Sequence, residues 1–270
     1  MNEKILSAKA LLSFSFIYEQ IRNPTDPRYD TFFASILKNH DLDFAGDIRI
    51  VSWNYDYQFE KAYSLYSGSP SLIKNQEKLR VVPGHPRLPV HAEKFSIFKI
   101  NGTTSFYDSN TPELLHPLDD LSIGANKRVS PIPVDKRRFP VDVSEETQAD
   151  LAKTFTDYYY KSINGTYLPM LSFAWENISD TSMSTQVLNT CINSIGQTKA
   201  LVVIGYSFPF FNREIDKKII AHLGVEYPIY IQDPNFFEVE SNLKSVIQKG
   251  HNNPIIRVSN LNQFYLPAEF

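Results

Sequence analysis

Four short polar segments, each following an apolar run, hold the residues whose types are best suited to chemistry. They are 54–56 (Asn-Tyr-Asp), Asn101-Gly102, Gly205-Tyr206-Ser207 and Asp233-Pro234. Amide, hydroxyl and carboxylate groups of this kind donate to and accept from the polar groups of small ligands. In a parallel sheet such ligands lie outside the carboxyl ends of the strands. The spacing of these segments therefore predicts one polar site built from the ends of four strands.

Apolar runs and helical spacing predict the elements that must position these segments. Strands are expected at 46–53, 95–100, 200–204, 228–232 and 254–258. Helices are expected at 1–23, 29–39, from Asp56 to Tyr66, and at 145–161, 182–196, 212–223 and 236–249. Strands that alternate with helices of about 12 residues indicate βαβ units. We therefore expect an α/β fold with a doubly wound, mainly parallel Rossmann-like sheet and helices on both faces.

The length of 270 residues favours one domain, 1–270. Inside it we expect an N-terminal helical segment at about 1–40 and an irregular insertion at about 105–143, because that stretch is rich in proline and charge. The apolar start lacks a small-residue cleavage site, which favours a helix over a signal peptide. No apolar run is long enough to span a membrane, so a cytoplasmic protein is expected.

Composition excludes several classes of site. The net charge of -3 gives no basic field for nucleic acid, and a single Cys191 excludes a disulfide framework and a Cys-rich zinc site. Six scattered histidines show no metal-binding spacing, so no metal is expected. The ten glycines lie at least nine residues apart, which leaves no glycine-rich phosphate loop.

The four segments together resemble the sirtuin-like family, in the divergent branch of bacterial NAD-degrading anti-phage defence proteins. The matching stretches occur in the family's order over about 47–235: IVSWNYDYQFEKAY, IFKINGTTSF, LVVIGYSFPFFNREID and IYIQDP. The resemblance implies a domain that binds NAD and hydrolyses it to nicotinamide and ADP-ribose. It also implies NAD or a related nucleotide as ligand and a defence-system protein as partner, while the formation of a homo-oligomer stays open.

The same resemblance assigns roles to particular residues. Asn54 would hold the nicotinamide ribose or a water near its anomeric carbon, and Asp56 would contact the nicotinamide carboxamide. Asn101 occupies the catalytic position. Gly102 and Gly205 would let the backbone approach the cofactor, with Tyr206 beside it. Ser207 would donate to a phosphate or ribose oxygen, and Asp233 would accept from the adenosine ribose hydroxyls.

Two departures from the family support an alternative. The family opens with a Gly-Ala-Gly phosphate turn that is missing here, and its catalytic histidine is replaced by Asn101. An amide cannot take a proton from ribose at neutral pH. The alternative is a catalytically degenerate module that binds a nucleotide or a partner protein in a larger assembly. His85, His91 or His116 stays open as a substitute base.

Structural roles are the competing interpretation of each segment. Asn54 or Asp56 would cap the next helix, Ser207 would do the same, and Asp233 would begin a helix before Pro234. A serine hydrolase is disfavoured because Pro209 stands where the nucleophile turn needs a small residue. A zinc-containing deacetylase is disfavoured because it needs four cysteines.

Overall fold

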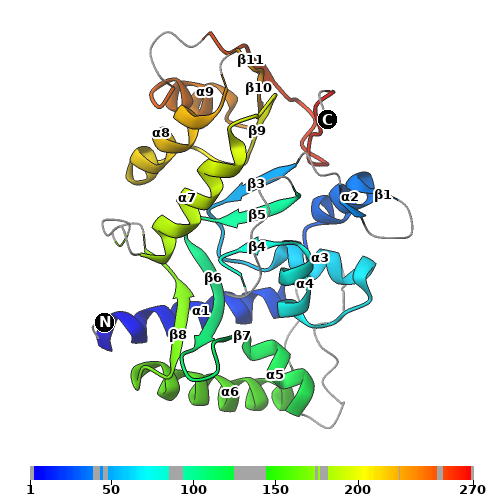
Figure 1. Cartoon of the computed structure of the whole chain (residues 1–270). Helices are drawn as coiled ribbons and strands as arrows, with labels where there is room; N and C mark the ends of the chain where they lie inside the picture. Colours follow the sequence, from blue (N-terminus) through cyan, green and yellow to red (C-terminus); the bar gives the residue numbers. More distant parts are fainter. Residues whose placement is uncertain are drawn as a thin grey trace.

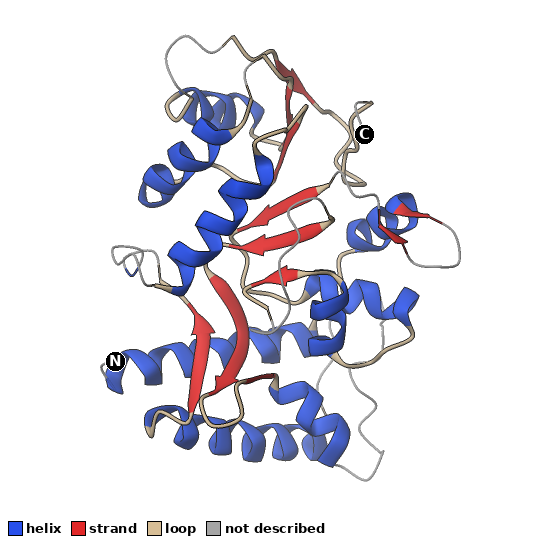
Figure 2. Ribbon diagram, viewed as in Figure 1, coloured by secondary structure: helices blue, strands red, loops and turns tan. Residues whose placement is uncertain are grey.

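The structure is a computed structural model that describes residues 3–38, 43–44, 48–84, 94–124, 144–173, 176, 182–224, 226–247 and 252–268. The described chain is a mixed α/β fold. Hydrogen bonding joins its strands into two parallel three-stranded sheets, one antiparallel three-stranded sheet and a small antiparallel pair (Figures 1 and 2).

The first parallel sheet contains the first two polar strand ends. Its order is β3 (Arg49–Ser52), β5 (Ser96–Lys99) and β4 (Val81–Val82). Ser52 lies opposite Lys99, so β3 and β5 end at the same level. Helices α3 (Gln58–Ser67) and α4 (Leu72–Lys78) follow β3, and Ser71 caps α4 by accepting from the Lys74 N–H.

The second parallel sheet contains the other two polar strand ends. Its order is β9 (Leu201–Ile204), β10 (Ile229–Gln232) and β11 (Ile255–Arg257). Four helical elements belong to this half: α7 (Met183–Ile195), the 3₁₀ turn η2 (Phe210–Asn212), α8 (Arg213–His222) and α9 (Phe236–Lys244). Figure 1 shows this sheet beyond the β3 edge of the first, so β4 and β11 lie farthest apart.

The antiparallel sheet and its helices form the other end of the molecule. The sheet order is β7 (Glu113–Leu115), β6 (Gly102–Asp108) and β8 (Tyr167–Leu171). Helices α1 (Glu3–Arg22) and α6 (Glu145–Ile163) pack on it, and α5 (Pro117–Gly124) contacts α6 (Figure 2). The remaining elements are α2 (Pro27–Ile36) and the short strands β1 (Leu37–Lys38) and β2 (Asp43–Phe44).

One hydrophobic core joins the two parallel sheets. It combines Phe98 and Ile100 at the end of β5 with Val203 of β9 and the buried face of α7, including Leu188. Two further clusters lie under α1 and α6, and between α2, α3 and β5. The shared core holds the carboxyl ends of β3, β5 and β9 in one region although no continuous sheet joins them.

Two expectations from the sequence need correction. A single doubly wound sheet is not what the described strands form, since β3 and β9 belong to separate sheets. The stretch 105–143 is not irregular throughout, because β6, β7 and α5 occupy it as far as residue 124. Residues 125–143, as well as His85 and His91, lie outside the described residues.

Candidate functional site

The first three polar segments meet at the carboxyl ends of the two parallel sheets. The Asn101 side-chain amide donates to the Trp53 carbonyl at 3.2 Å, which ties the end of β5 to the end of β3. The Trp53 ring stacks on the Tyr206 ring with centroids 4.3 Å apart, which ties β3 to the segment after β9. Stacked aromatic pairs at this separation are attractive beyond their buried area. The two sheets are therefore linked by side chains at their ends.

The fourth segment joins through the second sheet. The Gly205 N–H donates to the Gln232 carbonyl at 3.3 Å, directly before Asp233. Asn54, Gly205 and Ser207 are exposed and Asp233 is half-buried. We call these four residues, Asn54, Gly205, Ser207 and Asp233, the strand-end rim. The rim contains the exposed residues of the predicted site, and Asp56 and Tyr206 are half-buried as Asp233 is.

The two carboxylates already have local partners. Asp56 Oδ1 accepts from the Gln58 N–H at 3.3 Å at the start of α3, and Asp233 Oδ1 accepts from the Asn235 N–H at 2.7 Å before α9. Each bond closes a turn two residues long, a common role for aspartate after a strand. Both aspartates therefore have a structural role, but as turn formers before the helices: the N-cap residues of α3 and α9 are Tyr57 and Asn235. Ser207, in contrast, caps no described helix with its side chain.

Asn101 lies below the rim. Its side chain is buried, and its backbone carbonyl accepts from the Ser172 N–H at 2.8 Å. Its Oδ1 atom and the Trp53 Nε1 atom are both buried without a hydrogen-bond partner. Such orphaned atoms are costly in a protein interior, and both are closed to solvent below the rim.

The two glycines differ in what they require. At Gly102, φ is +84° and a Cβ atom would lie 1.9 Å from the Met170 carbonyl oxygen. This position excludes side chains because β6 pairs with β8 there, so its glycine is explained by packing. At Gly205, φ is +59° but no atom lies within 4 Å of a Cβ. Gly205 therefore serves a left-handed turn, and the space beside it is open.

Tyr206 is fixed by two residues that sequence reasoning left without a role. Its hydroxyl donates to the Asp216 carboxylate at 2.9 and 3.0 Å and accepts from the Asn212 amide at 3.1 Å. Burial raises the pKa of Asp216 to about 7, although Tyr206 and Arg213 oppose the shift. Asn212 and Asp216 are four residues apart, which could have indicated a shared helix face.

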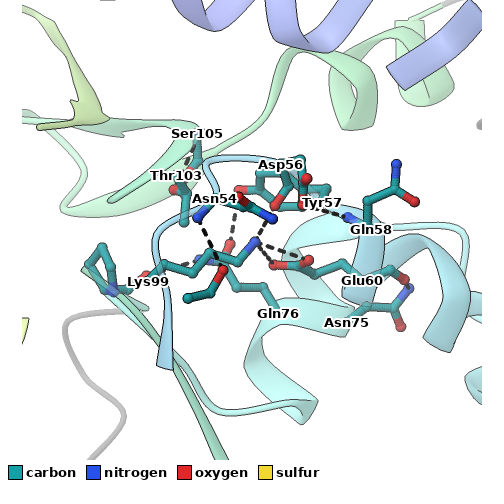
Figure 3. Close-up of polar contacts among 12 residues, drawn as sticks. Asn54, Asp56, Tyr57, Gln58, Glu60, Asn75, Gln76, Lys99, Thr103 and Ser105 are labelled. Atoms are coloured by element: carbon teal, nitrogen blue, oxygen red, sulfur yellow. Dashed lines mark hydrogen bonds and ion pairs between the residues drawn. The ribbon is translucent and has the colours of Figure 1, made fainter. Parts of the chain in front are cut away.

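A second polar cluster lies beneath the segment that carries Asn54 (Figure 3). The Lys99 ammonium contacts both Glu60 carboxylate oxygens, at 2.9 and 3.2 Å, and also donates to the Asp56 carbonyl. It lies 4.7 Å from the centroid of the Tyr57 ring. Glu60 belonged to the resemblance motif, but Lys99 was missed because the lysine stands in an otherwise apolar strand.

His116 is the described histidine that was considered as a substitute base. It is 1% exposed, its Nδ1 accepts from the Leu118 N–H at 3.3 Å, and its ring lies 4.5 Å from Tyr57. Burial lowers its pKa to about 4, so the ring is neutral at pH 7. Enclosed behind Tyr57, it does not reach the strand-end rim.

The described residues contain no group of three or more potential metal ligands. In the same part of the chain, no helix has both the length and the apolar character needed to cross a membrane. Comparisons with models of protein families, with curated proteins and with solved structures found no match for this chain.

Proposed function

We propose that the strand-end rim binds NAD and that the protein hydrolyses it to nicotinamide and ADP-ribose. The observation that carries the proposal is the meeting of three strand ends through the Asn101–Trp53 bond and the Trp53–Tyr206 stack. β3 and β9 are the edge strands at which the two parallel sheets face each other, and each sheet extends away from them. Ligands of open α/β folds bind in the crevice outside the strand ends where the direction of winding changes.

The polar groups of the rim fit a dinucleotide. Asn54 offers both a donor and an acceptor to the nicotinamide ribose and an attacking water. Gly205 leaves room for close approach, Ser207 donates to phosphate or ribose oxygens, and Asp233 accepts from ribose hydroxyls.

In this reaction the protein mainly has to position NAD and the attacking water and to stabilise the transition state. The bond between ribose C1′ and the nicotinamide nitrogen breaks, and its electron pair leaves with nicotinamide. The water oxygen bonds to C1′ and one proton passes to solvent. A positively charged, oxocarbenium-like transition state is stabilised by oriented dipoles such as the Asn54 amide. The role in bacterial defence rests on the sequence resemblance alone.

A non-catalytic module that binds a nucleotide or a partner protein is the second candidate. It is favoured by Asn101, whose buried amide stands where the family has a histidine. It is also favoured by the enclosure of His116. The two candidates share the binding site and differ in turnover.

Chromatography of NAD incubated with the purified protein separates the two candidates. We compare wild type, Asn54→Ala and Asn110→Ala, the last an exposed asparagine at the distant β6–β7 turn. Nicotinamide release that is lost only in Asn54→Ala supports hydrolysis. Calorimetric binding of millimolar NAD without release supports the non-catalytic module. If wild type neither binds nor cleaves NAD, hydrolysis is refuted, and the non-catalytic module must bind another nucleotide or a partner protein.

A further inference from the structure

The Lys99–Glu60 pair is the most deeply buried ion pair among the described residues. The Lys99 side chain is 1% exposed and the Glu60 side chain is fully buried. Burial raises the pKa of Glu60, and the adjacent Lys99 ammonium opposes that shift. Removing two charges from water is expensive, and a hydrophobic pair of similar volume is often as stable. The ion pair therefore calls for an explanation other than stability.

The contacts of Lys99 point to that explanation. Lys99 is the last residue of β5 and Glu60 lies in the first turn of α3, so the pair joins the sheet to the helix. The third contact of the ammonium is the Asp56 carbonyl, inside the loop 53–57 that connects β3 to α3. Figure 3 shows Lys99 extending beneath this loop toward Glu60.

The rest of the loop is held at its two ends. Asn101 binds the Trp53 carbonyl at 3.2 Å, and the Tyr57 N–H donates to the Gln20 side chain at 2.9 Å. Asn54 stands between these anchors with an exposed side chain. The middle of the loop has two ties from the strands: the Tyr55 carbonyl accepts from the Thr104 N–H at 3.3 Å, and the Asp56 carbonyl accepts from Lys99. Loss of the Lys99 contact would leave the turn at Asp56, two residues after Asn54, without its side-chain anchor to the sheet.

We propose that Lys99 and Glu60 are positioning residues that hold loop 53–57 in the conformation in which Asn54 faces a ligand. Lys99 binds the loop carbonyl, and Glu60 balances the ammonium charge and orients it. Neither residue touches the ligand or transfers a proton. The fixing of the loop stands on the contacts above, while its consequence for NAD rests on the proposed function.

The test compares two residues at equivalent places. Lys99→Met/Glu60→Gln removes both charges and keeps the side-chain volumes. Gln232→Met is the matched control, because Gln232 is the buried last residue of the central strand of the second sheet. Gln232 anchors the carbonyls of Asn260 and Gln263 as Lys99 anchors that of Asp56.

Amide hydrogen exchange followed by mass spectrometry reports on each segment. In the double variant we expect the amides of 54–58 to exchange about tenfold faster, with 260–265 unchanged. In Gln232→Met we expect the reverse pattern. Lys99→Arg keeps a charge opposite Glu60 but replaces the compact ammonium, so exchange in 54–58 should rise by about threefold with the fold retained. Unchanged exchange at 54–58 in the folded variants overturns the proposal.

An activity measurement separates this proposal from the proposed function. If wild type releases nicotinamide from NAD, kcat of the double variant should fall by about tenfold while Gln232→Met stays near wild type. Equal losses in the two variants overturn the proposal, because a general loss of stability would then explain them. If wild type neither binds nor cleaves NAD, the proposed function fails and the exchange pattern still decides whether Lys99 and Glu60 fix the loop.

Discussion

The two parallel sheets fix their strand-end segments with different chemistry. At the first sheet, Lys99 and Glu60 form a buried pair of opposite charges that holds the loop after β3. At the second sheet, the Tyr206 hydroxyl donates to the carboxylate of Asp216 on α8 and accepts from the Asn212 amide. Asp216 is 1% exposed, and no buried cation pairs with it within hydrogen-bond distance in the described chain.

The two arrangements differ in how much the loss of one partner destabilises the fold and in how strongly the stability depends on pH. Burial raises the pKa of Glu60, but the adjacent Lys99 ammonium offsets part of the cost, so the loss of one partner is severe. Asp216 relies on the Tyr206 hydroxyl for its hydrogen bonds, and burial raises its pKa to about 7. The first arrangement is therefore expected to lose most when one partner is removed. The second is expected to lose stability as its carboxylate ionises.

The largest effect is expected when the ion pair is broken from one side. Lys99→Met leaves the fully buried Glu60 without a counter-charge, which should lower the free energy of unfolding by about 3–5 kcal/mol. Urea denaturation at pH 7 measures this. Lys99→Met/Glu60→Gln should recover much of the loss, since no uncompensated charge remains. A loss below about 1 kcal/mol in the single variant would mean that water reaches Glu60.

Asp216, in the half of the molecule that contains the second sheet, is expected to make the free energy of unfolding fall as the pH rises. The pKa of Asp216 rises from 3.8 to about 7 on folding, so between these values the folded protein holds a proton that the unfolded chain has released. Stability from this residue is therefore greatest at low pH and is lost as pH rises through about 7. Relative to Asp216→Asn, wild type should lose roughly 2–4 kcal/mol between pH 4 and pH 8.

Thermal or urea unfolding of the two proteins across that pH range gives the comparison. Asparagine keeps an acceptor for the Tyr206 hydroxyl and cannot ionise, so it isolates the titration of Asp216. Other carboxylates titrate in both proteins and cancel in the difference. If the difference in stability between the two proteins stays the same across this pH range, the prediction is wrong. Asp216 would then give the second half of the molecule no pH dependence of its own.

Much of the second parallel sheet follows from local pattern. Leu201 to Ile204 is a short apolar run followed by a left-handed glycine, and the chain forms β9 there. Only Val203 of this strand is buried, but the continuous apolar run is visible in the sequence alone. The helices at 145–163 and 183–195 begin after serine caps at Ser144 and Ser182 that the sequence also displays.

The antiparallel sheet could not be predicted in the same way. β6 is rich in hydroxyl residues, yet Thr103, Thr104 and Ser105 are buried; α1 packs against the strand, and the Thr103 and Ser105 hydroxyls bond each other. β8 contains Pro169, which usually argues against a strand but is tolerated at a sheet edge. Neither strand shows an apolar alternation, so β8 was not expected at all. The irregular insertion was expected at about 105–143 from its proline and charge, and it overlaps the end of β6 and all of β7.

The candidate site was partly predictable for a related reason. The residues after each strand were visible because polarity follows an apolar run. Lys99 was not, since a charged residue is normally exposed and its partner lies 39 positions earlier in the chain. Only the folded chain reveals that this lysine is buried under the loop that carries Asn54.

The smallest effect on stability is expected at the two aspartates that occupy matching places in the two halves. Asp56 and Asp233 each accept from the N–H two residues further on. Serine can close the same turn with its hydroxyl, so Asp56→Ser and Asp233→Ser should each cost less than about 1 kcal/mol. Urea denaturation checks that both variants remain as folded as wild type.

With the turns preserved, the two substitutions separate a local role from ligand binding. Serine removes the charge and one acceptor oxygen while the backbone stays in place, so a purely structural aspartate should leave NAD binding unchanged. If Asp233 accepts from ribose hydroxyls, Asp233→Ser should weaken NAD binding by about tenfold. If Asp56 contacts the nicotinamide, Asp56→Ser should instead lower the release of nicotinamide.

Calorimetry and chromatography on the same samples distinguish these results. Unchanged values for both variants would mean that the two carboxylates only close their turns. The ligand contacts would then have to come from Asn54 and Ser207.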